Sequence, residues 1–169
     1  MGLCRGVNVA GAGRFARFSV RAMLEAMSKT YEADFYSWTR AQAEALRRRS
    51  ANELDWDNLA EELETLGRSE ARELYSRYVV LLTHLLKWIR QPDRRGRSWE
   101  NTIAIQRREL ARHLRLNPGL VSVEAGEFAD AYDRARREAS SETDLDLAEF
   151  PETPPFTLEQ AKDEAWLPA

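Results

Sequence analysis

Six polar side chains that can do acid–base or binding chemistry stand in or beside the most apolar stretches of this chain. They are Glu61, Glu62, His84, Lys87, Gln106 and Arg107, and they are called the polar cluster below. A histidine can transfer a proton near neutral pH, and a carboxylate can act as a base. The six residues form a site only if the fold brings them to one cleft that solvent can reach.

His84 lies at the edge of an apolar stripe formed by Leu81, Leu85 and Trp88, which recur at helical spacing. One interpretation is a half-buried histidine that shuttles protons. The other is a structural histidine whose ring packs and whose nitrogens bond to a neighbouring helix. A single histidine without known geometry is weak evidence for catalysis, so the structural interpretation is favoured.

Glu61 and Glu62 fall in the acidic first half of a predicted helix, where negative charge suits the positive end of the helix dipole. This position indicates a solvated surface. In an alternative arrangement, one of the two turns inward and pairs with Lys87 or Arg107. A buried ion pair of this kind often fixes the register of two helices without adding net stability.

Gln106 stands in the middle of a second apolar stripe, formed by Trp99, Ile103 and Leu110. A buried amide without a partner costs about 1–3 kcal/mol. We therefore expect Gln106 to bond to His84 or to a backbone carbonyl, or to mark a small polar pocket.

The sequence contains no recognisable catalytic motif, and we expect no metal and no cofactor. Its one cysteine, Cys4, and its two histidines, His84 and His113, cannot build a structural zinc cluster. The Glu-x-x-His pairs with which helical bundles hold metal are also missing. Neither a glycine-rich phosphate loop nor a nucleophile elbow occurs.

The composition is that of a soluble globular protein, with 43% hydrophobic and 31% charged residues. No apolar run approaches the roughly 20 residues that span a bilayer, so we expect no membrane segment. The arginine clusters are interleaved with acidic residues and the net charge is −3, so we do not expect nucleic-acid binding. The single cysteine fits a reducing compartment, and we expect a cytoplasmic protein.

Residues 1–29 differ from the rest of the chain, because they carry five basic residues and only Glu25 as an acid. We interpret them as a disordered arm, or as the result of a start codon placed too early, with Met27 as the true start. Residues 30–169 are predicted to form a single helical-bundle domain.

Hydrophobic periodicity predicts four main helices, over residues 31–49, 55–90, 98–117 and 123–140. Helix starts are expected at a capping box of Thr39 and Gln42, at Asp55 and at Ser98, while Gly67 is expected to bend or interrupt the long second helix. A second capping box, Thr157 with Gln160, predicts a short C-terminal helix. The fold class is therefore all-α, a bundle of four main helices whose short C-terminal helix is docked by an extended proline-rich segment.

Several short motifs follow one another in a characteristic order. They are Tyr31-Glu32-Ala33-Asp34-Phe35-Tyr36-Ser37-Trp38, Leu54-Asp55, Asn58-Leu59-Ala60-Glu61-Glu62, Leu66-Gly67, His84-Leu85-Leu86-Lys87-Trp88, Pro92, Ser98-Trp99, Ile103, Gln106-Arg107, Phe150-Pro151 and Pro155-Phe156. Over residues 31–168 the chain thereby resembles the bacterial domain-of-unknown-function family 29. The resemblance implies an all-helical bacterial domain and carries over no activity, substrate or catalytic residue.

Two functions are compatible with these observations. The first is a protein-interaction or adaptor module with a protein partner, or a homodimer, which fits a charged surface without a catalytic motif. The second is an enzyme or small-ligand binder that uses the polar cluster.

Overall fold

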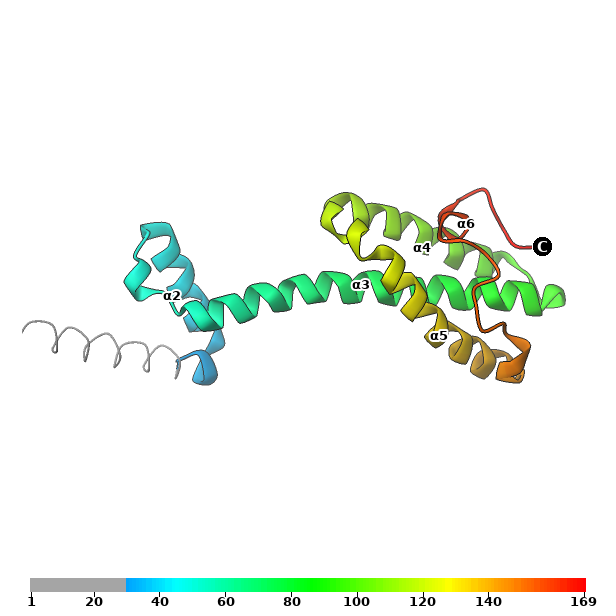
Figure 1. Ribbon diagram of the computed structural model, residues 1–169, viewed down its shortest axis with the longest axis horizontal. Helices are drawn as coiled ribbons and strands as arrows, with labels where there is room; N and C mark the ends of the chain where they lie inside the picture. The colour runs from blue at the N-terminus through cyan, green and yellow to red at the C-terminus, as the bar shows by residue number, and fades with distance from the viewer. Residues whose placement is uncertain (1–29) are drawn as a thin grey trace, which may run out of the picture. The chain divides into compact units, whose positions relative to one another are not determined.

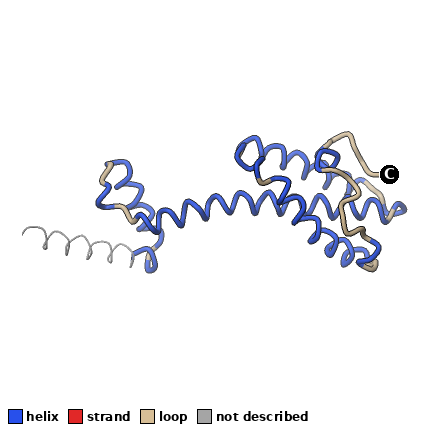
Figure 2. The backbone as a smooth tube through the Cα atoms, in the orientation of Figure 1, coloured by secondary structure: helices blue, strands red, loops and turns tan. Residues whose placement is uncertain are grey.

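The described residues of this chain, 30–169 in the computed structural model, form helices and no strand (Figures 1 and 2). The predicted arm of residues 1–29 lies outside the described residues. The chain divides into two compact units, residues 1–65 and residues 66–169. Within residues 30–169, no helix has the length and hydrophobicity needed to cross a membrane.

The all-α prediction is confirmed, with four long helices and a short one near the C-terminus within residues 30–169. These are α2 (Phe35–Arg48), α3 (Trp56–Arg90), α4 (Arg97–Leu116), α5 (Glu124–Thr143) and α6 (Leu158–Lys162). Short 3₁₀ helices occupy Ala51–Glu53, Pro92–Arg94, Pro118–Ser122 and Leu147–Glu149. Two of these begin with proline, which fits a first helical position because its missing N–H needs no partner there.

The start of α2 differs from the prediction, because the helix is capped by Asp34 and not by Thr39. The Asp34 carboxylate accepts a hydrogen bond from the Ser37 backbone N–H at 3.0 Å. The hydroxyl of Thr39 donates instead to the carbonyl of Tyr36 at 2.8 Å, inside the helix. The hydrogen bonding from Ser37 also holds the pKa of the Asp34 carboxyl below its usual value. An aspartate is among the best N-caps, so α2 begins five residues earlier than the capping-box pattern indicated.

Of the other expected helix features, one was wrong and one was confirmed. Helix α3 is continuous from Trp56 to Arg90, so Gly67 does not interrupt it. The N-cap of α4 is Gly96 and not Ser98. The capping box of Thr157 and Gln160 is present at α6, with both reciprocal hydrogen bonds.

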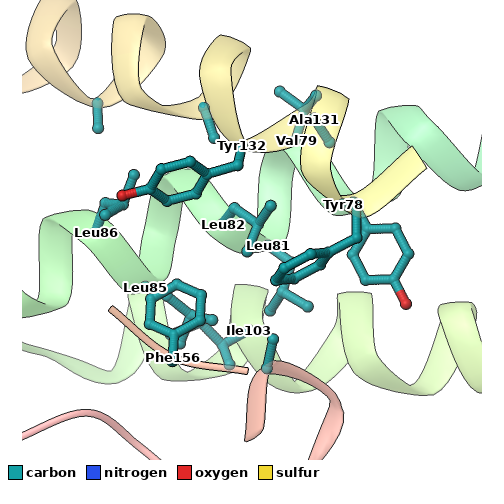
Figure 3. Close-up of a cluster of buried hydrophobic side chains, with 14 of the residues drawn as sticks. Tyr78, Val79, Leu81, Leu82, Leu85, Leu86, Ile103, Ala131, Tyr132 and Phe156 are labelled. Atoms are coloured by element: carbon teal, nitrogen blue, oxygen red, sulfur yellow. The ribbon is translucent and has the colours of Figure 1, made fainter. Parts of the chain in front are cut away.

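The second unit holds the main hydrophobic core, in which the C-terminal half of α3 is covered by α4 and α5 (Figure 1). The α3 side chains Leu74, Tyr78, Leu81 and Leu85 are fully buried. Figure 3 shows Leu81 and Leu85 of α3 directed toward the interior of the unit, with Phe156 entering from the extended segment. Burial of apolar surface on this scale is the main stabilising term of the unit.

The extended proline-rich segment after α5 is fixed to the second unit by side chains and by hydrogen bonds. Phe150 and Phe156 are buried in the core. The hydroxyl of Tyr132 on α5 lies 2.8 Å from the carbonyl of Pro151 and 3.2 Å from that of Thr153, and it can donate to either. The segment therefore docks α6, as predicted.

The first unit, in its described part, is a small hairpin of α2 and the start of α3. Its buried residues are Trp38, Gln42, Ala45, Leu54 and Asp55. Only three of these five side chains are apolar, so residues 30–65 by themselves have a minimal core. Below about 40 residues, such a core seldom suffices for independent stability.

Candidate functional site

The polar cluster of the sequence is distributed over both units. Glu61 and Glu62 lie in the first unit, and the other four residues lie in the second. Glu62 accepts a hydrogen bond from the hydroxyl of Tyr31 at 2.6 Å. This hydrogen bond, followed by desolvation and by the charges of Glu62, Glu61 and Asp55, raises the pKa of Tyr31 to about 12. The two glutamates therefore contribute to a negative potential at the surface of the hairpin.

Lys87 is buried, and its charge is paired with an acid that the sequence analysis did not consider. Its Nζ donates to Glu142 Oε2 on α5 at 2.6 Å. The same ammonium lies 4.8 Å from the ring centroid of Trp99 on α4, which is cation–π distance. The acid that pairs with Lys87 is thus Glu142 of the same unit.

His84 is half-buried and hydrogen-bonded within its own helix. Its Nδ1 lies 2.9 Å from the carbonyl of Val80, and this geometry assigns the proton to Nδ1 as the donor. Burial lowers the pKa of His84 below its usual value, and the charge of Lys87 adds to this effect. The Val80 carbonyl and Glu142 oppose it. The ring is therefore held in its neutral form at physiological pH.

The buried position on α4 belongs to Arg107 and not to Gln106. The core face of this helix consists of Ile103, Arg107 and Leu110, while Gln106 is half-buried beside it. Both residues fit the helical spacing of the apolar stripe. Which of them is buried depends on the group that lies opposite α4. That group is the carbonyl of Ala161 at the end of α6, which accepts a hydrogen bond from Arg107 Nε at 2.8 Å.

Gln106 Oε1 is buried without a hydrogen-bond partner, and the same is true of Nη2 of Arg107. Burial also lowers the pKa of the Arg107 guanidinium, although Asp163 and Glu164 act in the opposite direction. The structure thus brings His84 and Lys87 together with Glu142, and it places Arg107 at the end of α6.

The second unit also contains an open cleft of about 760 Å³ between α3 and α5. Its floor is apolar, with Ala71, Val79 and Val80, and Arg134 and Glu138 form part of its wall. These two wall residues form an ion pair of 2.8 Å with each other. None of the six residues of the polar cluster lines this cleft.

A buried polar triad in the second unit escaped the sequence analysis. The hydroxyl of Tyr78 donates to Glu124 Oε1 at 2.6 Å, and Lys162 Nζ donates to the same oxygen at 2.8 Å. Desolvation, followed by the hydrogen bond to Glu124, raises the pKa of Tyr78 well above its usual value. The triad joins α3, α5 and α6. Its only sequence signal was a tyrosine in the centre of an apolar stripe.

The hairpin of the first unit is organised around a second buried carboxylate, Asp55. Its Oδ2 accepts hydrogen bonds from Trp38 Nε1 at 3.3 Å and from Asn58 Nδ2 at 2.8 Å. Its backbone N–H donates to Gln42 Oε1 at 2.9 Å. These bonds connect α2 to the start of α3 and leave little polar capacity for chemistry, so this network has a structural role.

The hairpin also exposes large apolar side chains, which are called its apolar surface below. They are Phe35, Tyr36, Leu46, Trp56 and Leu63, with exposed fractions of 49–71%. On α3 the two members of the set, Trp56 and Leu63, are two turns apart on the same face of the helix. Exposed apolar side chains that share a helix face are candidates for a binding surface.

Within residues 30–169, no group of three or more histidine, cysteine, aspartate or glutamate side chains is placed to hold a metal ion. No curated protein and no solved structure matches the chain. The family described as Domain of unknown function DUF29 matches residues 30–167. This range includes both the hairpin with its apolar surface and the second unit with its buried triad. The chain therefore belongs to the DUF29 family.

Proposed function

We propose that this DUF29 protein is a protein-interaction module and that its apolar surface on the hairpin of residues 30–65 binds the partner. The single observation that carries the proposal is the exposure of Leu63 and Trp56, at 68% and 58%, on a hairpin whose residues 30–65 have a minimal core. We further propose a bacterial cytoplasmic setting, which the single cysteine of the chain supports.

The energetics of the hairpin support this function. Its three buried apolar side chains contribute little to folding, whereas binding a partner would remove further apolar area from water at roughly 25 cal/mol per Å². Aromatic side chains such as those of Trp56 and Tyr36 are also the residue types that are enriched in interfaces. Binding of a partner would therefore also stabilise the folded hairpin.

Leu63→Ser tests the proposal, because it removes an apolar contact without disturbing the core. We expect native mass spectrometry of the chain, purified gently from its own host, to show an additional polypeptide or a homodimer for the wild type. For Leu63→Ser we expect loss of that species. Leu116→Ser is the matched control, since Leu116 at the end of α4 is exposed to a similar extent, 61%. A bare monomer in all three preparations would contradict the proposal.

A second candidate function, binding of a small ligand by the four residues of the polar cluster in the second unit, is favoured by one observation. Gln106 Oε1 and Arg107 Nη2 are buried without partners, and such atoms are costly unless something satisfies them. This function requires His84 to act on a ligand, whereas the interaction module needs it only for packing.

His84→Ala separates the two candidates. Because burial lowers the pKa of His84, the folded state prefers the neutral ring. The stability that this preference contributes is complete above the unfolded pKa of about 6.5, and it is lost as the pH falls through the folded value. We expect His84→Ala to lose this part of the acid sensitivity in urea denaturation and to keep partner binding. Loss of binding with unchanged unfolding would favour the ligand site.

A further inference from the structure

Within the first unit, the hairpin of residues 30–65 is acidic. Residues 30–65 contain nine acidic and four basic residues. Three of the four arginines are consecutive, Arg47 to Arg49, at the end of α2, and Arg48 forms ion pairs there with Glu53 and Glu44. The excess negative charge therefore belongs mainly to α3.

The acids of α3 form a row beside the apolar residues of the same helix. Asp57, Glu61 and Glu64 are spaced by four and three residues, so they share one face. Each follows directly after a residue of the apolar row Trp56, Ala60 and Leu63, which places the acidic row about 100° round the helix from it. The row Trp56, Ala60 and Leu63 is called the apolar strip below.

Acidic residues near the acidic row add to its negative electrostatic potential. Glu61 and Glu62, together with Asp55, raise the pKa of Tyr31 at the start of the hairpin. Asp57 and Glu61 are exposed. Charges of one sign beside an apolar contact surface attract partners of the opposite sign and repel partners of the same sign.

We propose that the apolar strip of α3 and its acidic row bind a basic amphipathic helix of a partner protein. This inference rests on the proposed function and names the chemistry of the partner. A helix is the matching element because the strip is linear, with anchors at helical spacing that fit those of a second helix. A basic partner is required because Asp57, Glu61 and Glu64 flank the strip on its exposed side. A second copy of the chain would bring the same acidic row and meet like charge.

Two synthetic helical peptides test the partner chemistry directly. Both carry leucine at the same four positions, and they differ only in their flanking residues, which are lysine in one and glutamate in the other. Their binding to the full chain is measured by fluorescence anisotropy. We expect the lysine peptide to bind and the glutamate peptide to bind at least tenfold more weakly.

Variants of the protein show whether this binding uses the strip. We expect Leu63→Ser to lower the affinity for the lysine peptide at least tenfold. The exposed control Leu116→Ser is expected to leave this affinity unchanged. The double variant Asp57→Lys, Glu61→Lys is expected to reverse the preference toward the glutamate peptide. Affinity for the lysine peptide is expected to fall as salt rises, because the charges are exposed.

Each contrary result identifies what has failed. If both peptides bind equally and Leu63→Ser loses this binding, the proposal of a basic partner is overturned and the proposed interaction module is retained. If Leu63→Ser leaves the affinity for the lysine peptide unchanged, the peptide is attracted by charge without contacting the strip, and the inference is overturned. The inference is also overturned if neither peptide binds. If the wild type sediments as a dimer and Leu63→Ser sediments as a monomer, the strip binds a second copy of the chain. The basic partner is then overturned, and the proposed interaction module is retained.

Discussion

Replacing Leu85 with alanine is expected to lower the free energy of unfolding by about 3 kcal/mol. Leu85 is fully buried in the core of the second unit, where α3 meets α4 and the extended segment. Removal of a buried leucine side chain loses its transfer free energy and leaves a cavity, and the two effects together amount to about 2–5 kcal/mol. Urea denaturation followed by far-ultraviolet circular dichroism measures the change.

Leu63→Ala provides the control on the same helix. Leu63 is 68% exposed, so its truncation is expected to change the free energy of unfolding by less than about 0.5 kcal/mol. Leucine and alanine are both strong helix formers, which keeps the effect on α3 itself small. A similar loss of stability in the two variants would mean that Leu63 is covered in the folded protein, and it would contradict the proposed interaction surface.

The second large effect is expected for Glu124→Ala, with a loss of about 3 kcal/mol. The Glu124 carboxylate is the common acceptor of Tyr78 and Lys162. Its removal leaves the fully buried Tyr78 hydroxyl without this acceptor, and an unpaired buried hydroxyl costs about 1–3 kcal/mol. Lys162 loses its ion pair as well, although its partial exposure allows water to replace part of that interaction.

Tyr78→Phe is the matched variant for the same triad. It keeps the ion pair of Glu124 and Lys162 and removes only the hydroxyl, so a smaller loss of about 1–2 kcal/mol is expected at neutral pH. Because the folded pKa of Tyr78 is raised, its stabilisation is complete below pH 10 and is lost as the pH rises and the unfolded tyrosine ionises. The difference between wild type and Tyr78→Phe should therefore shrink above pH 10.

Hydrogen exchange of α6 distinguishes the triad from a general loss of packing. Lys162 is the last residue of α6, so Glu124→Ala should increase exchange in α6 more than in α4. A stability loss below about 1 kcal/mol for Glu124→Ala, or equal exchange in both helices, would show that the triad does not hold the C-terminal segment in place.

The helices could be located from the sequence because they depend on local periodicity. Leu81, Leu85 and Trp88 recur at three and four residues, and they are buried on one face of α3 as expected. Proline and a reciprocal capping box marked helix ends for the same reason. The start of α2 was misplaced because Asp34 and Thr39 are both acceptable caps, and the choice depends on whether Phe35 and Trp38 belong to the helix.

The polar residues could be located only in part. Gln106 and Arg107 both fit the apolar stripe of α4, and the carbonyl of Ala161, contributed by a segment more than fifty residues away, decided which one is buried. Glu142 as the partner of Lys87 likewise comes from a distant helix. A spacing rule describes one helix at a time and contains no information about what lies opposite.

The sequence by itself determined the helical class of the fold, the bounds of its long helices to within a few residues and membership of the DUF29 family. These follow from patterns within short segments, where the period of the helix acts on every residue. The tertiary structure alone decided that Tyr78, Glu124 and Lys162 share one oxygen and that Leu63 is exposed while Leu85 is buried. Leu63 and Leu85 belong to the same apolar periodicity, and only the helices that cover α3 distinguish them.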